Sequence, residues 1–240
     1  MELTAWLASK ESALRCVAIA LLLVGLMVVP GRGQSTARLQ GPTDEQITLA
    51  DIEVRRLVTL LRLEPGTTVA DVGAGLGAWS LRFSQWTGPS GHVYATDIGE
   101  EQLAILRAVA VREGLSNVTV IAGATASTNL PAGCCDAILL RNVFHYLTEP
   151  AAMIRSLAAS LKPGGRLAIV DFPPRPNTTA PPGVPANRGG QGVPPDVVER
   201  EVGVLFRHVT TVPNWAPEGV PSWVPPEIAP SFVAIFEKTR

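Results

Sequence analysis

Apolar and polar positions follow two periodicities along the middle of the chain. Five short apolar runs predict strands, at residues 67–72, 92–97, 118–122, 136–141 and 166–171. Apolar residues at helical spacing predict helices before and between these strands, over residues 45–61, 78–86, 100–113 and 142–160. The alternation of strand and helix from residue 45 to 171 predicts an α/β domain whose parallel sheet is covered on both faces.

Both ends of this region carry further signals. Thr43 to Gln46 predicts a helix start with an oxygen-bearing cap, and Lys162 to Gly165 predicts a tight turn before the fifth strand. Two segments dense in proline and glycine follow, and they are incompatible with a packed helix or a central strand. These loops span residues 173–195 and 213–230. A lid over a substrate and irregular surface wrapping both remain open for them.

The pattern between and after these loops predicts three further secondary-structure elements. They are a helix from Pro195 to about Phe206, a strand at 208–212 and a closing strand from Ser231 to Glu237. A final strand at this place completes the sheet of one domain, expected over residues 44–240 and preceded by a linker at 34–43.

Residues 16–29 form an uncharged apolar run that basic residues precede and small residues follow. This layout predicts that residues 1–33 are a signal peptide or an N-terminal membrane anchor, and a start buried in the fold is the third alternative. Fourteen helical residues span only about 21 Å, less than a hydrocarbon core of about 30 Å. Positive charge before the run favours an exported or periplasmic domain, with membrane association through this segment if it is not cleaved.

Composition narrows the class of ligand. The chain has 240 residues, 46% of them hydrophobic, and a formal net charge of −1, so no basic excess indicates nucleic acid. Adjacent Cys134 and Cys135 are expected to be two small apolar residues entering a buried strand, because neighbouring cysteines rarely bridge. No spacing of Cys, His and Asp suits a metal, so we predict no metal site.

The segment Asp71 to Gly77 places three glycines directly after the first strand. Glycine allows a sharp turn and a close approach of a ligand, and the next helix directs its positive end toward that ligand. Asp97 ends the second strand, where a carboxylate can accept hydrogen bonds from both hydroxyls of a ribose. Because Gly73, Gly75 and Ala78 also fit the dinucleotide spacing, an NAD-dependent oxidoreductase is one interpretation.

Four segments extend this pattern along the chain: Val69–Gly77 (VADVGAGLG), Val93–Ile98 (VYATDI), Leu130–Leu147 (LPAGCCDAILLRNVFHYL) and Leu161–Asp171 (LKPGGRLAIVD). In this order they resemble the motifs of class I S-adenosylmethionine-dependent methyltransferases. The resemblance implies a Rossmann-like, doubly wound, seven-stranded sheet that is mostly parallel with an antiparallel last strand. The dinucleotide interpretation does not account for the last two segments.

The resemblance also implies roles for single residues. It assigns the amino-acid part of S-adenosylmethionine to the glycine turn, at Asp71, Gly73, Ala74, Gly75 and Gly77. Asp97 would bind the ribose, Ile98 would pack on the adenine, and Asn142 would lie near the methionine end. Members of this family often carry Gly-Asp after the third strand, whereas this chain has Gly123-Ala124. Either backbone groups serve there, or cofactor binding is weak or lost.

We therefore expect methyl transfer to a small-molecule acceptor. Alignment can supply much of the catalysis, and a base is needed only if the acceptor loses a proton. His145 is the candidate base because it follows the fourth strand, where ligands of such sheets bind; a structural histidine bonded to the backbone is the alternative. The alternative function is a methyltransferase-like binding module without turnover outside the cytoplasm.

Overall fold

The computed structural model describes residues 40–215 and 231–239. Their helices are α2 (Asp44–Leu61), α3 (Ala78–Thr87), α4 (Glu100–Arg112), α5 (Pro150–Ser160) and α6 (Pro195–Val202). Two short 3₁₀ helices are η1 (Phe144–Tyr146) and η2 (Ala186–Arg188). The strands are β1 (Thr68–Val72), β2 (His92–Asp97), β3 (Val118–Ala122), β4 (Cys135–Arg141), β5 (Leu161–Asp171), β6 (Phe206–Val212) and β7 (Phe232–Lys238).

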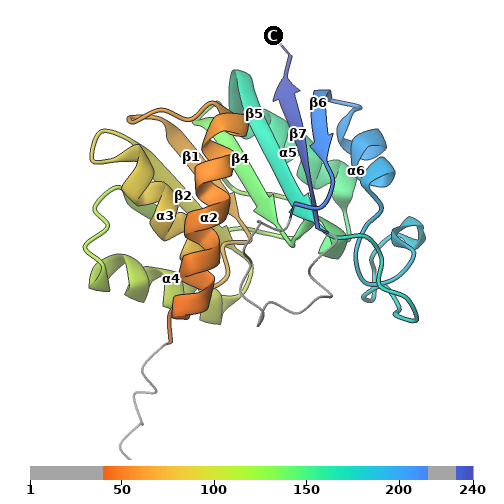
Figure 1. The fold of residues 1–240 in the computed structure, drawn as a ribbon, viewed down its shortest axis with the longest axis horizontal. Coiled ribbons are helices and arrows are strands. Elements are labelled where there is room, and N and C mark those ends of the chain that lie inside the picture. The colour runs from red at the N-terminus through yellow and green to blue at the C-terminus, as the bar shows by residue number, and fades with distance from the viewer. Residues whose placement is uncertain (1–39, 216–230, 240) are drawn as a thin grey trace, which may run out of the picture. The chain divides into compact units, whose positions relative to one another are not determined.

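These strands form one seven-stranded sheet in the order β3-β2-β1-β4-β5-β7-β6 (Figure 1). The pairs from β3 through β5 are all parallel, and β7 runs antiparallel to both of its neighbours. The expected doubly wound, mostly parallel sheet with an antiparallel last strand is therefore confirmed. The strand order reverses between β1 and β4, and ligands of open α/β sheets bind beyond the carboxyl ends of the strands at such a point.

Helices cover both faces of the sheet (Figure 1). Apolar residues of α2 and α3 pack on one face, and those of α5 and α6 pack on the other. Leu106 of α4 packs against Ala95 of β2 at the outer part of the first face. Helix α2 begins with a reciprocal cap between Thr43 and Gln46, as the sequence predicts, since each side chain binds the other residue's amide.

Three expected boundaries are wrong. Helix α6 ends at Val202 instead of about Phe206, because Phe206 already begins β6, with Gly203 as the C-cap of the helix. The segment after β4 is a short 3₁₀ turn followed by α5, instead of one helix over 142–160, because Pro150 sits at the first helical turn and cannot continue a helix from before it. Strand β5 begins at Leu161, before the expected turn. It pairs there with Cys135 and resumes at Arg166 opposite Ala137, so the glycines form an irregularity inside the strand.

Cys134 and Cys135 are joined by a disulfide, which corrects the expectation that neighbouring cysteines would not bridge. The chain turns at Gly133, whose φ is +59°, directly before the pair. This turn leaves Cys134 half-buried in the loop while Cys135 enters β4 and is fully buried. The expectation of a cysteine at the start of a buried strand therefore holds for Cys135.

The first proline-rich segment, residues 173–195, has internal bonding of its own. The amide of Arg175 donates to the carbonyl of Gln191 at 2.8 Å, and the amide of Gln191 donates to the hydroxyl of Thr178 at 2.8 Å. These bonds tie the two arms of the segment together. Of the second loop, residues 216–230 lie outside the described residues, as does the predicted N-terminal segment.

Arg188 anchors the proline-rich segment to the domain. Its side chain is fully buried and donates to both carboxylate oxygens of Glu201 in α6, at 2.9 and 3.1 Å. Its guanidinium also lies 5.1 Å from the ring centroid of Phe144 in η1. A buried cation is stable only with such partners, so this arginine fixes the segment beside the end of β4.

The structure describes no helix within 40–215 or 231–239 that is both long enough and apolar enough to span a membrane. The division of the chain into a leader, a linker and a domain from residue 44 remains a prediction.

Replacing Arg188 by Ala should lower the free energy of unfolding by about 3 kcal/mol, because it leaves Glu201 without its buried partner and opens a cavity beside Phe144. Urea denaturation followed by circular dichroism measures this change. The matched control is Arg200→Ala, whose pair with Asp196 is exposed and should contribute less than about 0.5 kcal/mol. Equal losses for the two variants would contradict an anchoring role for Arg188.

Candidate cofactor-binding site

The glycine turn between β1 and α3 packs tightly on one side and is open on the other. Gly73 has a φ of +74°, and a Cβ atom there would collide with the side chain of Val143. Gly75 has a φ of +54°, but a Cβ atom there would meet nothing within 4 Å. The first glycine thus allows two segments of the fold to approach, and the second borders open space that a ligand can occupy.

The amides of this turn are already committed within the protein. Gly73 and Ala74 both donate to the carbonyl of Thr96, at 2.8 and 2.9 Å, and Gly75 donates to Oδ2 of Asp97 at 2.9 Å. Gly77 donates to the carbonyl of Ala74 at 2.9 Å and precedes α3. The turn is therefore held in shape by β2, and these four amides are not free donors for an anion.

Asp71 lies beneath the turn. Its carboxylate is buried, and its Oδ2 accepts a hydrogen bond from the hydroxyl of Ser80 at 2.6 Å. Burial raises the pKa of Asp71 to about 6, and the Ser80 hydrogen bonds and the charge of Arg141 oppose this shift. The structure thus places Asp71 as a support between the turn and α3.

Asp97 and Ile98 stand at the opposite side of the turn, at the end of β2. Oδ1 of Asp97 accepts hydrogen bonds from the amides of Ile98 and Gly99, at 2.8 and 3.1 Å. A carboxylate has about four acceptor sites, so with Gly75 bound to Oδ2 it can still accept from a ligand hydroxyl. The side chain of Ile98 is 64% exposed, which leaves an apolar surface beside this carboxylate.

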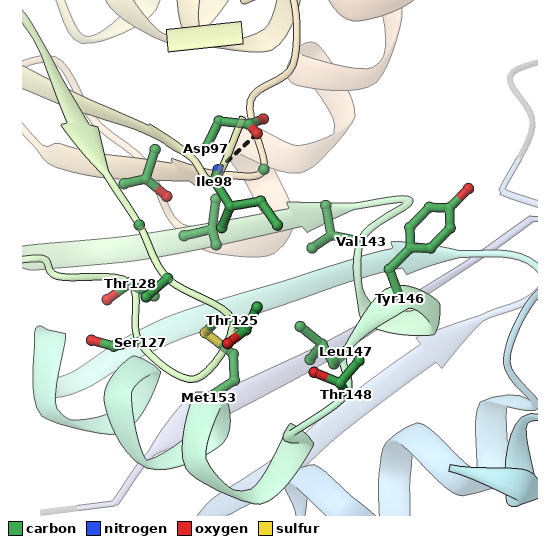
Figure 2. A pocket seen from close by; sticks show the side chains of 15 residues that line it. Asp97, Ile98, Thr125, Ser127, Thr128, Val143, Tyr146, Leu147, Thr148 and Met153 are labelled. Carbon is green, nitrogen blue, oxygen red and sulfur yellow. Dashed lines mark hydrogen bonds between the residues drawn. The ribbon is translucent and has the colours of Figure 1, made fainter. Parts of the chain in front are cut away.

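A cavity of about 400 Å³ opens between these residues and the segment after β4. Figure 2 shows Ile98, Val143, Leu147 and Thr125 around a common space, with Tyr146 at one end. The carboxyl ends of β1 and β2, the loop after β3, the segment after β4 and α5 all contribute to its wall. Its lining residues are Val72, Gly73, Thr96, Asp97, Ile98, Gly123, Ala124, Thr125, Ser127, Thr128, Val143, Tyr146, Leu147, Thr148 and Met153.

The loop after β3 supplies hydroxyl groups in the region where the family resemblance implies an acidic side chain. The backbone groups of Ala124 and Ser127 bond to each other, at 2.7 and 3.3 Å, and close a tight turn. Thr125 and Ser127 line the cavity on this side. The backbone groups of Ala124 itself are thus committed, and Asp97 is the only carboxylate among the residues that line the cavity.

His145 lies outside this cavity. Its ring is 1% exposed, Nδ1 lies 2.8 Å from Oδ1 of Asp171, and its amide donates to Oδ2 of the same carboxylate at 3.2 Å. The ring packs against Tyr146 and Phe172. The His145 ring therefore bonds the side chain of Asp171, whereas the alternative to a catalytic base was a histidine bonded to the backbone. This pair fixes η1 to the end of β5.

Asn142 does not line the cavity either. Its φ is +55°, and its amide donates to the carbonyl of Val170 at 2.8 Å. Sequence reasoning missed the apolar wall of Val143, Leu147 and Met153, because the segment after β4 has no periodicity that separates cavity side chains from core side chains. No three His, Cys, Asp or Glu side chains in the part of the chain that the structure describes are grouped for a metal ion.

Part of the chain matches a known protein family. Residues 69–165, which include β1 to β4 and the cavity wall, match the family described as a methyltransferase domain. The match confirms the resemblance to S-adenosylmethionine-dependent methyltransferases that the four segments indicated. It gives the dinucleotide interpretation no support.

Particular relatives share parts of the chain. A demethylmenaquinone methyltransferase from Listeria monocytogenes is 33% identical over 121 residues, which are 49% of this chain and 49% of that protein. The chain therefore matches about half the length of this relative. A crystal structure of a SAM-dependent methyltransferase from Aquifex aeolicus has a TM-score of 0.62 at 24% identity, over 82% of this chain and 94% of that one.

The same fold also occurs in a protein that is named for another activity. The [4+2]-cyclase SpnF has a TM-score of 0.62 at 16% identity, over 79% of this chain and 81% of that one. Similarity at this level shows the fold alone, so the reaction has to be argued from the site.

The raised pKa of Asp71 makes stability depend on pH. Because its folded pKa of about 6 lies above the ordinary value of 3.8 for an aspartate, ionisation destabilises the folded state, and this loss of stability develops as the pH rises from about 4 to above 6. Asp71→Asn removes the ionisation and keeps an oxygen for Ser80. The unfolding free energy of the variant, relative to the unmodified chain, should rise by about 2 kcal/mol between about pH 4.5 and 7.5.

Urea denaturation of both chains at the two pH values measures this difference. The comparison cancels the titration of all other groups that the two chains share. A difference that stays constant with pH would show that Asp71 ionises normally in the folded state.

Proposed function

We propose that this chain transfers a methyl group from S-adenosylmethionine to a small-molecule acceptor. One observation carries the proposal. An open glycine turn, a hydrogen-bond-accepting carboxylate at the end of β2 and a cavity lie next to one another, and all three belong to the residues that match a methyltransferase domain. The cofactor supplies a methyl group bound to a positively charged sulfur. The protein then has to align the acceptor with that group and exclude water.

The residues present fit this cofactor. The space beside Gly75 allows the backbone to approach a ligand closely, and Asp97 keeps acceptor capacity for a hydroxyl of a ribose. The exposed side chain of Ile98 offers a flat base an apolar surface. Asp71 would act indirectly, by holding the turn, and Gly73 by allowing Val143 to close the wall.

For the acceptor we propose a molecule with an apolar ring. Val143, Leu147 and Met153 form an apolar side of the cavity, and Tyr146 is 51% exposed at its end. The Listeria relative is named for a quinone-type acceptor, demethylmenaquinone. An electron-rich ring carbon or an acidic ring hydroxyl suits this cavity, because Asp97 already accepts three amides and His145 lies elsewhere.

The second candidate is a binding module without turnover, which the missing acid at Ala124 favours. Its distinguishing result is cofactor binding with no methylated product. Export or membrane association of the domain also remains a proposal, and it rests on the apolar run at 16–29 alone.

Calorimetric titration with S-adenosylmethionine, of the full chain and of one variant, tests the proposal. Asp97→Asn should weaken cofactor affinity at least about tenfold, because the ribose hydroxyls lose a charged acceptor while the amide keeps most of the shape. Asp196→Asn is the control, since it removes an exposed carboxylate on α6 far from the cavity in the sheet order.

Mass spectrometry of products from a panel of quinols and phenols completes this test. Binding with methylated product supports the enzyme, and binding without product favours the binding module. Absence of binding to the unmodified chain at millimolar cofactor would refute the proposal, and an unchanged affinity in Asp97→Asn would refute the position of the ribose.

The loop after β3 allows a gain-of-affinity test. Ala124→Asp should raise cofactor affinity about tenfold, because a carboxylate on this side of the cavity can accept a hydrogen bond from the amino group of adenine. The matched control is Ala126→Asp, which adds the same charge to the same turn at a position that does not line the cavity. Equal effects of both changes would mean that the adenine is not bound here. The same titration measures both variants.

A further inference from the structure

Three side chains from different elements meet where β4 ends. Arg141 of β4 donates from Nε to Oε2 of Glu53 at 2.7 Å, and from Nη2 to Oε1 at 3.2 Å. Trp79 of α3 donates from Nε1 to Oε2 of the same carboxylate at 2.9 Å. The guanidinium carbon lies 3.9 Å from the centroid of the Trp79 ring, so the cation is covered on one face by an aromatic ring.

This cluster is adjacent to the glycine turn. In the register of β1 with β4, Val72 pairs with Leu140, so the next residues along these parallel strands are Gly73 and Arg141. Asp71, on the same side of the turn, is close enough for the positive charge of Arg141 to oppose the rise of its pKa. The arginine therefore stands at the switch point of the sheet, beside the first glycine of the turn.

The bonding of Arg141 leaves part of its donor set unused. A guanidinium has five N–H donors, and Glu53 takes donors from Nε and Nη2. Nη1 forms no hydrogen bond to the described residues. The Arg141 side chain is 13% exposed, so the cluster is not fully closed to solvent.

We propose that Arg141 binds the α-carboxylate of the amino-acid part of S-adenosylmethionine, while Glu53 and Trp79 hold its guanidinium in place. The inference rests on the proposed function and adds a residue to its site. An incoming carboxylate would otherwise meet Asp71 and Glu53 beside the turn, and the amides of Gly73, Ala74 and Gly75 are already committed. A planar guanidinium that uses only Nε and Nη2 for its first carboxylate can donate paired hydrogen bonds to a second one.

Two ligands separate this role from a structural ion pair. S-adenosylmethionine carries the carboxylate, whereas 5′-methylthioadenosine has the same adenine, ribose and sulfur without the amino-acid part. Calorimetric titration of the full chain and of Arg141→Gln with both ligands should show at least about a tenfold loss of affinity for the first. The affinity for the second ligand should change less than about twofold.

Removing Arg141 alone leaves Glu53 buried without a partner, which can unfold the chain. The double variant Glu53→Gln/Arg141→Gln removes both charges and should show the same selective loss. Lys162→Gln is the control, because it neutralises a cation paired with Asp136 at the other end of β4 and should not distinguish the ligands.

The outcomes are separable. If the unmodified chain binds S-adenosylmethionine and the Arg141 variants lose both ligands equally, or neither, the cluster is a structural ion pair and the inference is wrong. If the unmodified chain binds no S-adenosylmethionine, the proposed function itself fails.

Discussion

The candidate site depends on the hydrogen bonds by which the glycine turn is tied to the end of β2. Thr96 accepts two amides of the turn through its carbonyl, and Asp97 accepts a third through its carboxylate. These bonds fix the turn against the neighbouring strand. A site that is already ordered loses less conformational entropy on binding than one that must still be ordered. The same carboxylate faces the cavity, so one side chain sets both the shape of the turn and the charge of the site.

Buried charge beneath the turn explains why α2 and α3 are part of the site and not only a cover for the sheet. Charged groups are stable away from water only with close partners, and here those partners come from different elements. Ser80 of α3 bonds Asp71, while Glu53 of α2 bonds Arg141. The turn, both helices and the end of β4 are therefore coupled, and a change in one of these charges affects the packing of the others.

Much of the fold could be predicted from sequence because its signals are local. The strands, the cap at Thr43 and the glycine turn each depend on a few neighbouring residues, and each is present in the structure. The side chains that define the site's chemistry pair across long sequence separations, such as the separation of 88 positions from Glu53 to Arg141. Periodicity carries no information on such pairs. Periodicity also did not predict the contact between His145 and Asp171. The expected helix over 142–160 does not form, because α5 begins only at Pro150 and the chain follows another course directly after β4.

The two sides of the cavity are built in different ways, and this difference bears on which reaction the fold supports. Asp97 and the turn belong to the ends of regular strands, whereas the apolar wall belongs to the irregular segment after β4. That segment is held by Asp171 on His145, and by Arg188 of the proline-rich segment against Phe144.

A Cβ atom on Gly183 would lie only 3.2 Å from Thr148, so the proline-rich segment passes close to this residue of the cavity wall. Loops vary more readily than the strands that carry them. The acceptor side of this fold can therefore change while the cofactor side is kept, because the two sides depend on different parts of the chain. Under the proposed function, residues 142–149 and 173–195 determine which acceptor binds, and the glycine turn has little influence on that choice.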